Sequence, residues 1–258
     1  MVAKIQSGYI EFQWKGDIDA LQRYLEGIPP DKDPEGSVTM SRWEAAMLKR
    51  DFAGAAKAIQ ASGREDFSYL PSAPQPRGFF LGLIALAQND HDRAIQELAT
   101  AAPHFEQDVK EAPDAADRRA SLGMLYAFMG RHDEAIREGK LAVELKPIEK
   151  DATDGATMLC YLALIYARVG EKDLAIQLID RLLKTPGAAD SVDYSITPND
   201  LKYRWEWDPL RSDPRFQKLL TKSGAQQRSG GSAIVDWVVP GFEFRTELID
   251  EALLEGAR

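Results

Sequence analysis

The side chains best suited to chemistry are few in this sequence. Its histidines are His91, His104 and His132, and its single cysteine is Cys160. His91 and His132 hold adjoining places in two turns of similar sequence, about one repeat of the chain apart. The ligands of a metal ion must converge within a few ångström, which equivalent turns do not readily supply. We therefore expect solvated histidines, no metal site and no cofactor.

Cys160 and the carboxylates favour structural roles. The cysteine lies in an apolar run from Met158 to Leu164, where a small buried residue is expected and a reactive thiol is not. A single cysteine excludes an intramolecular disulfide and a cysteine-rich zinc site. The many carboxylates fall on amphipathic helices, whose charged face is usually solvated. No pair of them stands out as an acid/base couple.

Sequence motifs of common enzymes are absent. The chain has no phosphate-binding loop of the Gly-x-x-x-x-Gly-Lys-Ser/Thr type and no Gly-x-Gly-x-x-Gly. It also lacks Gly-x-Ser-x-Gly, His-Glu-x-x-His, and the His-Arg-Asp and Asp-Phe-Gly strings of kinases. We expect a protein that is not an enzyme and has no catalytic residues.

Composition and charge restrict the class of partner. The 258 residues are 44% hydrophobic and carry a net charge of −9, whereas nucleic-acid-binding proteins are usually basic. Binding to nucleic acid or to an anionic membrane is therefore disfavoured. No apolar run approaches the length of a membrane-spanning helix, and the N-terminal residues do not resemble a signal peptide. These features predict a cytoplasmic protein.

The elements that must position any binding residues are repeats. Five segments share a polar turn followed by a helix whose first apolar anchor is an alanine, and the alanines recur at intervals of 35, 39, 41 and 40 residues. They are Ala20, Ala55, Ala94, Ala135 and Ala175. Before the last two turns, Gly123 and Ala163 occupy the same place, as do Tyr126 and Tyr166. Small residues at these places allow two antiparallel helices to approach closely, and stacked pairs bury a continuous strip.

This pattern resembles the tetratricopeptide repeat, with the best agreement in the fourth and fifth units. The resemblance covers roughly residues 1–186. It implies an all-α fold, a right-handed superhelical solenoid of antiparallel helix pairs, with about five repeats and a C-terminal helical cap. Pro-rich segments at 27–36 and 69–78 predict loops, and Pro103 predicts a kink or break in the helix that starts near His91.

A different block follows the repeats at 187–221. Asp213 before Pro214 predicts the start of a short helix that carries Phe216, Leu219 and Leu220. With Trp205 and Trp207, this helix is expected to seal the exposed end of the last repeat.

The string from Trp205 to Leu220 is similar to a segment that closes tetratricopeptide arrays in large bacterial signalling proteins. There the array follows a protein-kinase-like, an adenylyl or guanylyl cyclase, or a winged-helix domain. The likeness implies that this chain is the C-terminal sensory or scaffolding part of such a protein.

Residues 222–258 are expected to be a linker and a tail. Residues 221–232 are rich in Gly, Ser and Gln, as flexible linkers are. An extended apolar segment is predicted at 234–240 and an acidic amphipathic stretch at 246–255, which could dock on the array, contact a partner or be an unrelated appendage.

The predicted function is binding of a protein or peptide. In stacked helix pairs the first helices line a concave groove, and at the places that would face it this chain is mostly apolar. Such a groove suits an apolar helix face or an extended segment better than a C-terminal carboxylate. The alternative is an intramolecular regulatory segment of a kinase or cyclase signalling protein. The candidate groove residues are Phe79, Leu83, Leu86, Ala120, Met124, Ala127, Cys160, Leu164, Ala167 and Arg168.

Overall fold

The computed structural model describes residues 2–29, 33, 35–70, 72–184 and 196–229. The chain divides into two compact units, Met1–Thr221 and Lys222–Arg258. The helical pairs and the block that follows them all lie in the first unit, and every contact discussed below is within it.

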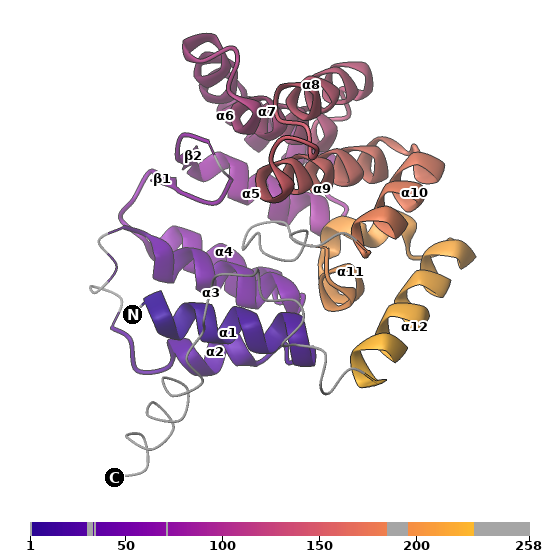
Figure 1. Ribbon diagram of the computed structural model, residues 1–258. Helices are drawn as coiled ribbons and strands as arrows, with labels where there is room; N and C mark the ends of the chain where they lie inside the picture. The colour runs from indigo at the N-terminus through magenta and orange to yellow at the C-terminus, as the bar shows by residue number, and fades with distance from the viewer. Residues whose placement is uncertain (1, 30–32, 34, 71, 185–195, 230–258) are drawn as a thin grey trace. The chain divides into compact units, whose positions relative to one another are not determined.

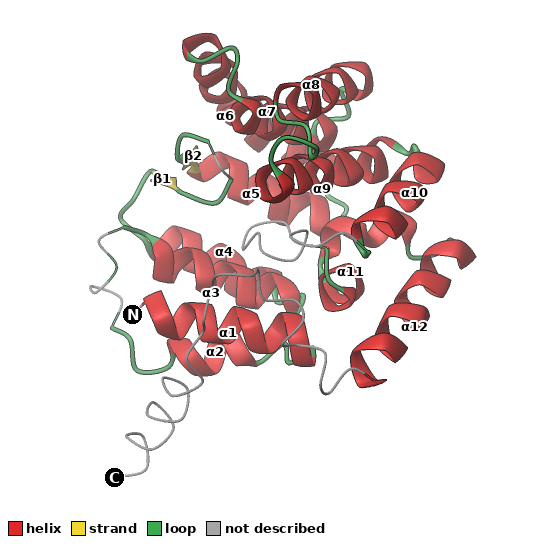
Figure 2. Ribbon diagram, viewed as in Figure 1, coloured by secondary structure: helices red, strands yellow, loops and turns green. Residues whose placement is uncertain are grey.

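Helices dominate the described residues (Figures 1 and 2). There are twelve α-helices and one 3-10 helix within the described ranges. Their bounds are α1 Val2–Lys15, α2 Ala20–Leu25, α3 Ser37–Leu48, α4 Phe52–Ala61, α5 Arg77–Ala87, α6 His91–Glu111, α7 Ala116–Phe128, α8 His132–Leu145, α9 Ala152–Val169, α10 Lys172–Leu182, α11 Pro198–Tyr203, the 3-10 helix η1 Trp205–Leu210, and α12 Pro214–Ser229.

The first ten helices pack as consecutive pairs, α1 with α2 through α9 with α10. The second helix of each of the first four pairs also contacts the first helix of the next pair. Close approach within a pair is clearest at Gly123, where an added Cβ would lie 3.1 Å from the backbone oxygen of Ala135 and 3.1 Å from the backbone nitrogen of Gly139. The mostly helical fold and the pairing of adjacent helices are thus confirmed. The superhelical path and the number of repeats stay predictions.

A two-stranded antiparallel sheet interrupts the helices before α5. Its strands are β1 Asp66–Phe67 and β2 Gln75–Pro76, with Phe67 opposite Gln75 (Figure 2). Gln75 is buried, and its side-chain oxygen accepts hydrogen bonds of 2.9 Å from the backbone nitrogens of Tyr69 and Leu70. The segment predicted as a loop is therefore partly a strand, held by one buried amide, and the fold is not all-α in the strict sense.

Pro103 does not break its helix. α6 runs from His91 to Glu111 with Pro103 inside it, so of the predicted kink or break the break is wrong, and the kink stays a prediction. The buried face of α6 continues on both sides of the proline, with Leu98 before it and Phe105 after it. Continuous packing outweighs the backbone hydrogen bond that proline removes.

α12 starts where the sequence predicts but is longer than predicted. α12 starts at Pro214 as predicted, and the Asp213 carboxylate accepts a hydrogen bond of 2.8 Å from the backbone nitrogen of Arg215. The helix continues to Ser229, so most of the predicted linker is helical, in keeping with its Ala, Gln and Arg residues. The predictions for 187–195, 234–240 and 246–255 lie outside the described residues.

Candidate functional site

Equivalent positions on the first helices follow from the spacing of the repeats. Shifting a residue by 35, 39, 41 and 40 moves it from one pair to the next. One such set contains three of the predicted groove residues, Leu83, Met124 and Leu164, and extends towards the N-terminus to Glu44 and Tyr9. These five residues lie on α5, α7, α9, α3 and α1, respectively.

The predicted groove residues are inside the protein. Nine of the ten are buried, and Arg168 is partly buried. The buried residues are Phe79, Leu83, Leu86, Ala120, Met124, Ala127, Cys160, Leu164 and Ala167. Their role in binding a partner stays a prediction, since in this conformation they are covered by other parts of the chain.

The segment 196–210, which contains α11 and η1, covers part of this face. Trp205 is 2% exposed and stacks on Phe128 at the end of α7, with 5.8 Å between ring centroids and an interplanar angle of 27°. The guanidinium of Arg168 on α9 lies 5.0 Å from the Trp205 ring centroid and 5.6 Å from that of Phe128. The tryptophan is thus held by an aromatic ring and a cation from two different pairs.

Arg204 joins the segment to the N-terminal pairs. Its Nη1 lies 2.5 Å from Glu44 Oε1 on α3, and its Nε donates a hydrogen bond of 2.8 Å to Asp200 Oδ1 on α11. The three charged side chains are each at most 4% exposed. The Tyr9 hydroxyl, on α1, donates a hydrogen bond to the other oxygen of Glu44. A buried cation and two carboxylates therefore connect α1, α3 and α11.

Two further contacts continue the junction. The Asn199 side-chain amide donates hydrogen bonds of 2.9 and 3.3 Å to the backbone oxygens of Gln13 and Trp14, at the end of α1. Arg50, in the turn after α3, makes two hydrogen bonds of 2.6 and 2.8 Å with the Asp208 carboxylate. The paired geometry of this second contact is the strong form of an arginine–carboxylate interaction.

The position of this segment corrects one prediction. α12 does reach the last pair, because Arg215 Nη1 lies 2.7 Å from Asp173 Oδ1 on α10. α11 and η1, however, contact α1, α3, α7 and α9, and so they do more than seal the end of the last repeat. The reason is Arg204, which needs buried carboxylates and obtains one of them from the second pair.

Burial controls the titration of this site. Burial by itself would lower the pKa of Arg204, but the carboxylates of Glu44 and Asp200 outweigh it and hold that pKa above its usual value. Burial, followed by the nearby charge of Glu44, raises the pKa of Tyr9. Burial also raises the pKa of Glu206, in η1, to about 7, although Arg204 acts to lower it. Arg204 thus remains charged near neutral pH, and Glu206 takes up or releases a proton there.

Two of the predicted groove residues lie at this site, and Trp205 was predicted only as part of the cap. Arg168 contacts Trp205, and the predicted groove residue Cys160 lies near Ile196 at the start of the segment. Glu44 was missed, yet it occupies the same place in its pair as Leu83, Met124 and Leu164 do in theirs. A carboxylate at an otherwise apolar place was the available signal. Nothing in the spacing identified Arg204 as its partner.

The described residues contain little that suggests catalysis or metal binding. No group of three or more His, Cys, Asp or Glu side chains in them is arranged to hold a metal ion. All three histidines are exposed. Burial raises the pKa of the Cys160 thiol, so that it is not a thiolate at neutral pH. None of the helices described is long and apolar enough to cross a membrane.

Comparison with known proteins supports the repeats. Residues 116–149 match the tetratricopeptide repeat. The match spans α7 and α8, the pair in which Gly123 makes its close approach, and it supports a tetratricopeptide repeat protein. Such repeats generally mediate protein–protein interactions and are typically non-catalytic scaffolds. No curated protein matches the chain.

Replacing Arg204 by methionine tests the buried junction between α11 and the N-terminal helix pairs. The Arg204→Met variant leaves the carboxylates of Glu44 and Asp200 buried without their cation, and we expect the free energy of unfolding to fall by about 3–5 kcal/mol. Arg215→Met is the matched control, because the Arg215 side chain is 56% exposed and solvent screens its ion pairs, so its loss should change the free energy of unfolding little. Urea unfolding followed by circular dichroism measures both. Equal losses would contradict the assigned role of Arg204.

A Glu206→Gln variant tests the titration. Below about pH 4.5 this carboxyl is protonated in the folded and unfolded chain; as the pH rises towards 7, only the unfolded chain ionises, and stability is lost. Glutamine cannot ionise, so the stability gained by Glu206→Gln should be about 2–3 kcal/mol larger at pH 8 than at pH 5. Urea unfolding at both pH values measures the gain in stability on substitution. Equal gains at pH 5 and pH 8 would show that Glu206 has an ordinary pKa.

Proposed function

We propose that this chain is a non-catalytic interaction scaffold that binds a protein or peptide segment on the face formed by the first helices of its pairs. The observation that supports this proposal is the segment 196–210, which lies on that face and contacts α1, α3, α7 and α9. The net charge of −9 supports a protein partner over nucleic acid. A cytoplasmic location is part of the same proposal.

The internal segment also indicates what chemistry the face accepts. Phe128 and Arg168 receive the ring of Trp205, and Glu44 receives the guanidinium of Arg204. The surrounding predicted groove residues are apolar. A partner that uses this face must replace the internal segment, and the best competitor is a short segment in which arginine precedes an aromatic residue. Buried aromatic and arginine anchors are the usual sources of binding energy at protein interfaces.

The same observation favours one alternative. An array that already holds a segment of its own chain is suited to act within a larger protein, as an intramolecular regulator of an attached kinase or cyclase domain. Adding the purified chain to such a domain, taken from the gene directly upstream, should change its activity. An unchanged rate would remove this alternative and leave the scaffold proposal intact.

A peptide that copies residues 197–211 tests the scaffold proposal. The labelled peptide should bind the Trp205→Ala variant, whose own segment has lost its aromatic anchor, at least about tenfold more tightly than the unaltered chain. Fluorescence anisotropy measures both affinities.

The control peptide carries alanine at the places of Arg204 and Trp205. It should bind the same variant at least about tenfold more weakly than the first peptide, because both anchors are missing. Equal binding of the two peptides, or no binding of either, would rule out this face as a recognition site for such segments.

A further inference from the structure

A second surface, on the other side of α3, forms a hollow of about 710 Å³ between α2 and α4. Its floor is one stripe of α3 at helical spacing, and one wall is the stripe of α4 that contains Gly54, Lys57, Ala58 and Ala61. The stripe of α3 consists of Thr39, Arg42, Ala45, Ala46 and Lys49. None of these residues belongs to the face on which 196–210 lies.

The equivalent floor in a later pair is covered by a helix. The places of Arg42 and Ala45 in α3 correspond to Leu162 and Ile165 in α9. Both are buried under α8, because a Cβ added at Gly139 of α8 would lie 3.1 Å from Leu162 Cδ1 and 2.7 Å from Ile165 Cδ1. This face of α9 is therefore covered by α8, the second helix of the preceding pair.

α2 is too short to do the same for α3. It has 6 residues and ends at Leu25, whereas α8 has 14 residues and ends at Leu145. The residue of α2 that corresponds to Gly139 is Tyr24. α2 ends one residue after Tyr24, whereas α8 continues for six residues after Gly139. The hollow opens beside the end of α2, where Gln22 and Leu25 line it, and the equivalent stretch after Gly139 in α8 is helical.

The charges of the hollow indicate the chemistry of that helix. Four cationic side chains line it, Arg42, Lys49, Lys57 and Arg64, on a chain whose net charge is −9. Three carboxylates also line it, but Asp33 accepts hydrogen bonds from the backbone of Val38 and Thr39 at the start of α3, and Asp51 from Gly54 at the start of α4. Lys49 is paired with Asp19 at 2.5 Å and Arg64 with Asp66 at 3.2 Å, so Arg42 and Lys57 are the lining cations without a carboxylate partner in the described residues, and Glu26 is the lining carboxylate left to oppose them.

Two of these cations are placed to meet a ligand. Arg42 stands where α9 has Leu162, so its guanidinium occupies a floor that is apolar in the later pair; one of its nitrogens donates to the backbone oxygen of Ile28 at 2.6 Å. Lys57 is exposed and makes no ion pair or hydrogen bond with any residue in the described part of the chain. Alanine and glycine beside them allow a helix backbone to approach closely.

We propose that this hollow, which we call the α2–α4 hollow, binds an acidic amphipathic helix of a partner protein. Small apolar residues of that helix pack on the partly buried Ala46 and Ala58, and its carboxylates meet Arg42 and Lys57. This is the helix-in-groove mode of recognition, with charge selecting the partner. The α2–α4 hollow is separate from the face in the proposed function, so an experiment can contradict one proposal and leave the other standing.

The probe is a synthetic amidated peptide of about 15 residues, the length at which an isolated helix becomes marginally stable. One face carries alanine and leucine at helical spacing, and the other carries glutamate. Two control peptides carry lysine in place of glutamate, or a central proline that breaks the helix. We expect only the acidic helical peptide to bind the full chain saturably in fluorescence anisotropy.

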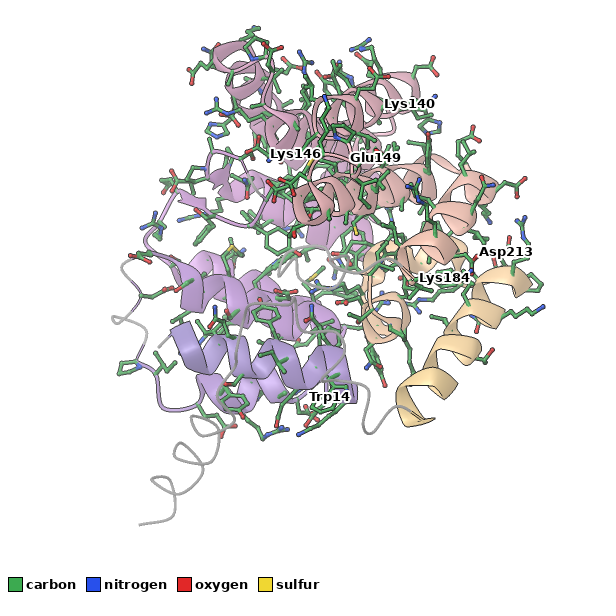
Figure 3. All side chains as sticks on the ribbon, viewed as in Figure 1. Trp14, Lys140, Lys146, Glu149, Lys184 and Asp213 are labelled. Carbon is green, nitrogen blue, oxygen red and sulfur yellow. The ribbon has the colours of Figure 1, made fainter. Side chains whose placement is uncertain are left out.

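Two substitutions in the hollow and one outside it complete the test. Ala58→Trp fills the hollow and should abolish binding, and Lys57→Glu reverses a charge and should weaken binding about fivefold. The matched control is Lys140→Glu, because Lys140 is also an exposed lysine but lies on α8 (Figure 3); it should leave the affinity unchanged. Circular dichroism checks that each variant is folded.

Several results would overturn the proposal. They are absence of saturable binding, equal binding of the acidic and basic peptides, and binding by a folded Ala58→Trp variant that equals that of the unaltered chain. The other candidate occupant is a second copy of this chain, and sedimentation of the unaltered chain tests it. Self-association that Ala58→Trp removes would assign the hollow to a second copy and not to a partner protein.

Discussion

The burial of one arginine determines how the parts of this chain come together. Arg204 is 2% exposed, and a guanidinium cannot be taken out of water unless carboxylates neutralise it and accept its hydrogen bonds. Asp200, one helical turn earlier, supplies one of them, and Glu44 on α3 supplies the other. Because Glu44 also accepts from Tyr9, a single charge cluster sets the distance between α1, α3 and α11.

Aromatic and apolar contacts add to this charge cluster in holding the segment 196–210 in place. Once Arg204 is placed, Trp205 meets Phe128 and Arg168, which come from α7 and α9. The face on which the segment lies is made of equivalent places in successive pairs, which are polar in α1 and α3 and apolar in α5, α7 and α9. The chain's own segment supplies both the arginine and the aromatic residue that meet this face.

The length of the second helix in each pair matters as much as the residues of the first helix. α8 covers the first helix of the following pair, and apolar residues lie beneath it. α2 ends after 6 residues, and the helix that follows it holds Arg42 where the later pair has leucine. The shortened helix and the polar floor occur together because an uncovered helix face must tolerate water or a charged partner.

The sequence by itself determined the helix pairs, their register and the absence of familiar catalytic motifs, since these follow from local periodicity and residue type. It also determined that α12 begins at Pro214, because an aspartate followed by proline is a local helix signal. Only the tertiary structure decided that residues 196–210 lie on the first helices. The contacts that place them join residues as far apart as Gln13 and Asn199, 186 positions along the chain, which no repeat spacing encodes. Only the tertiary structure, too, gave Glu44 its role, because the energy of a buried carboxylate depends on where its cation lies in space and not on the helix that carries it.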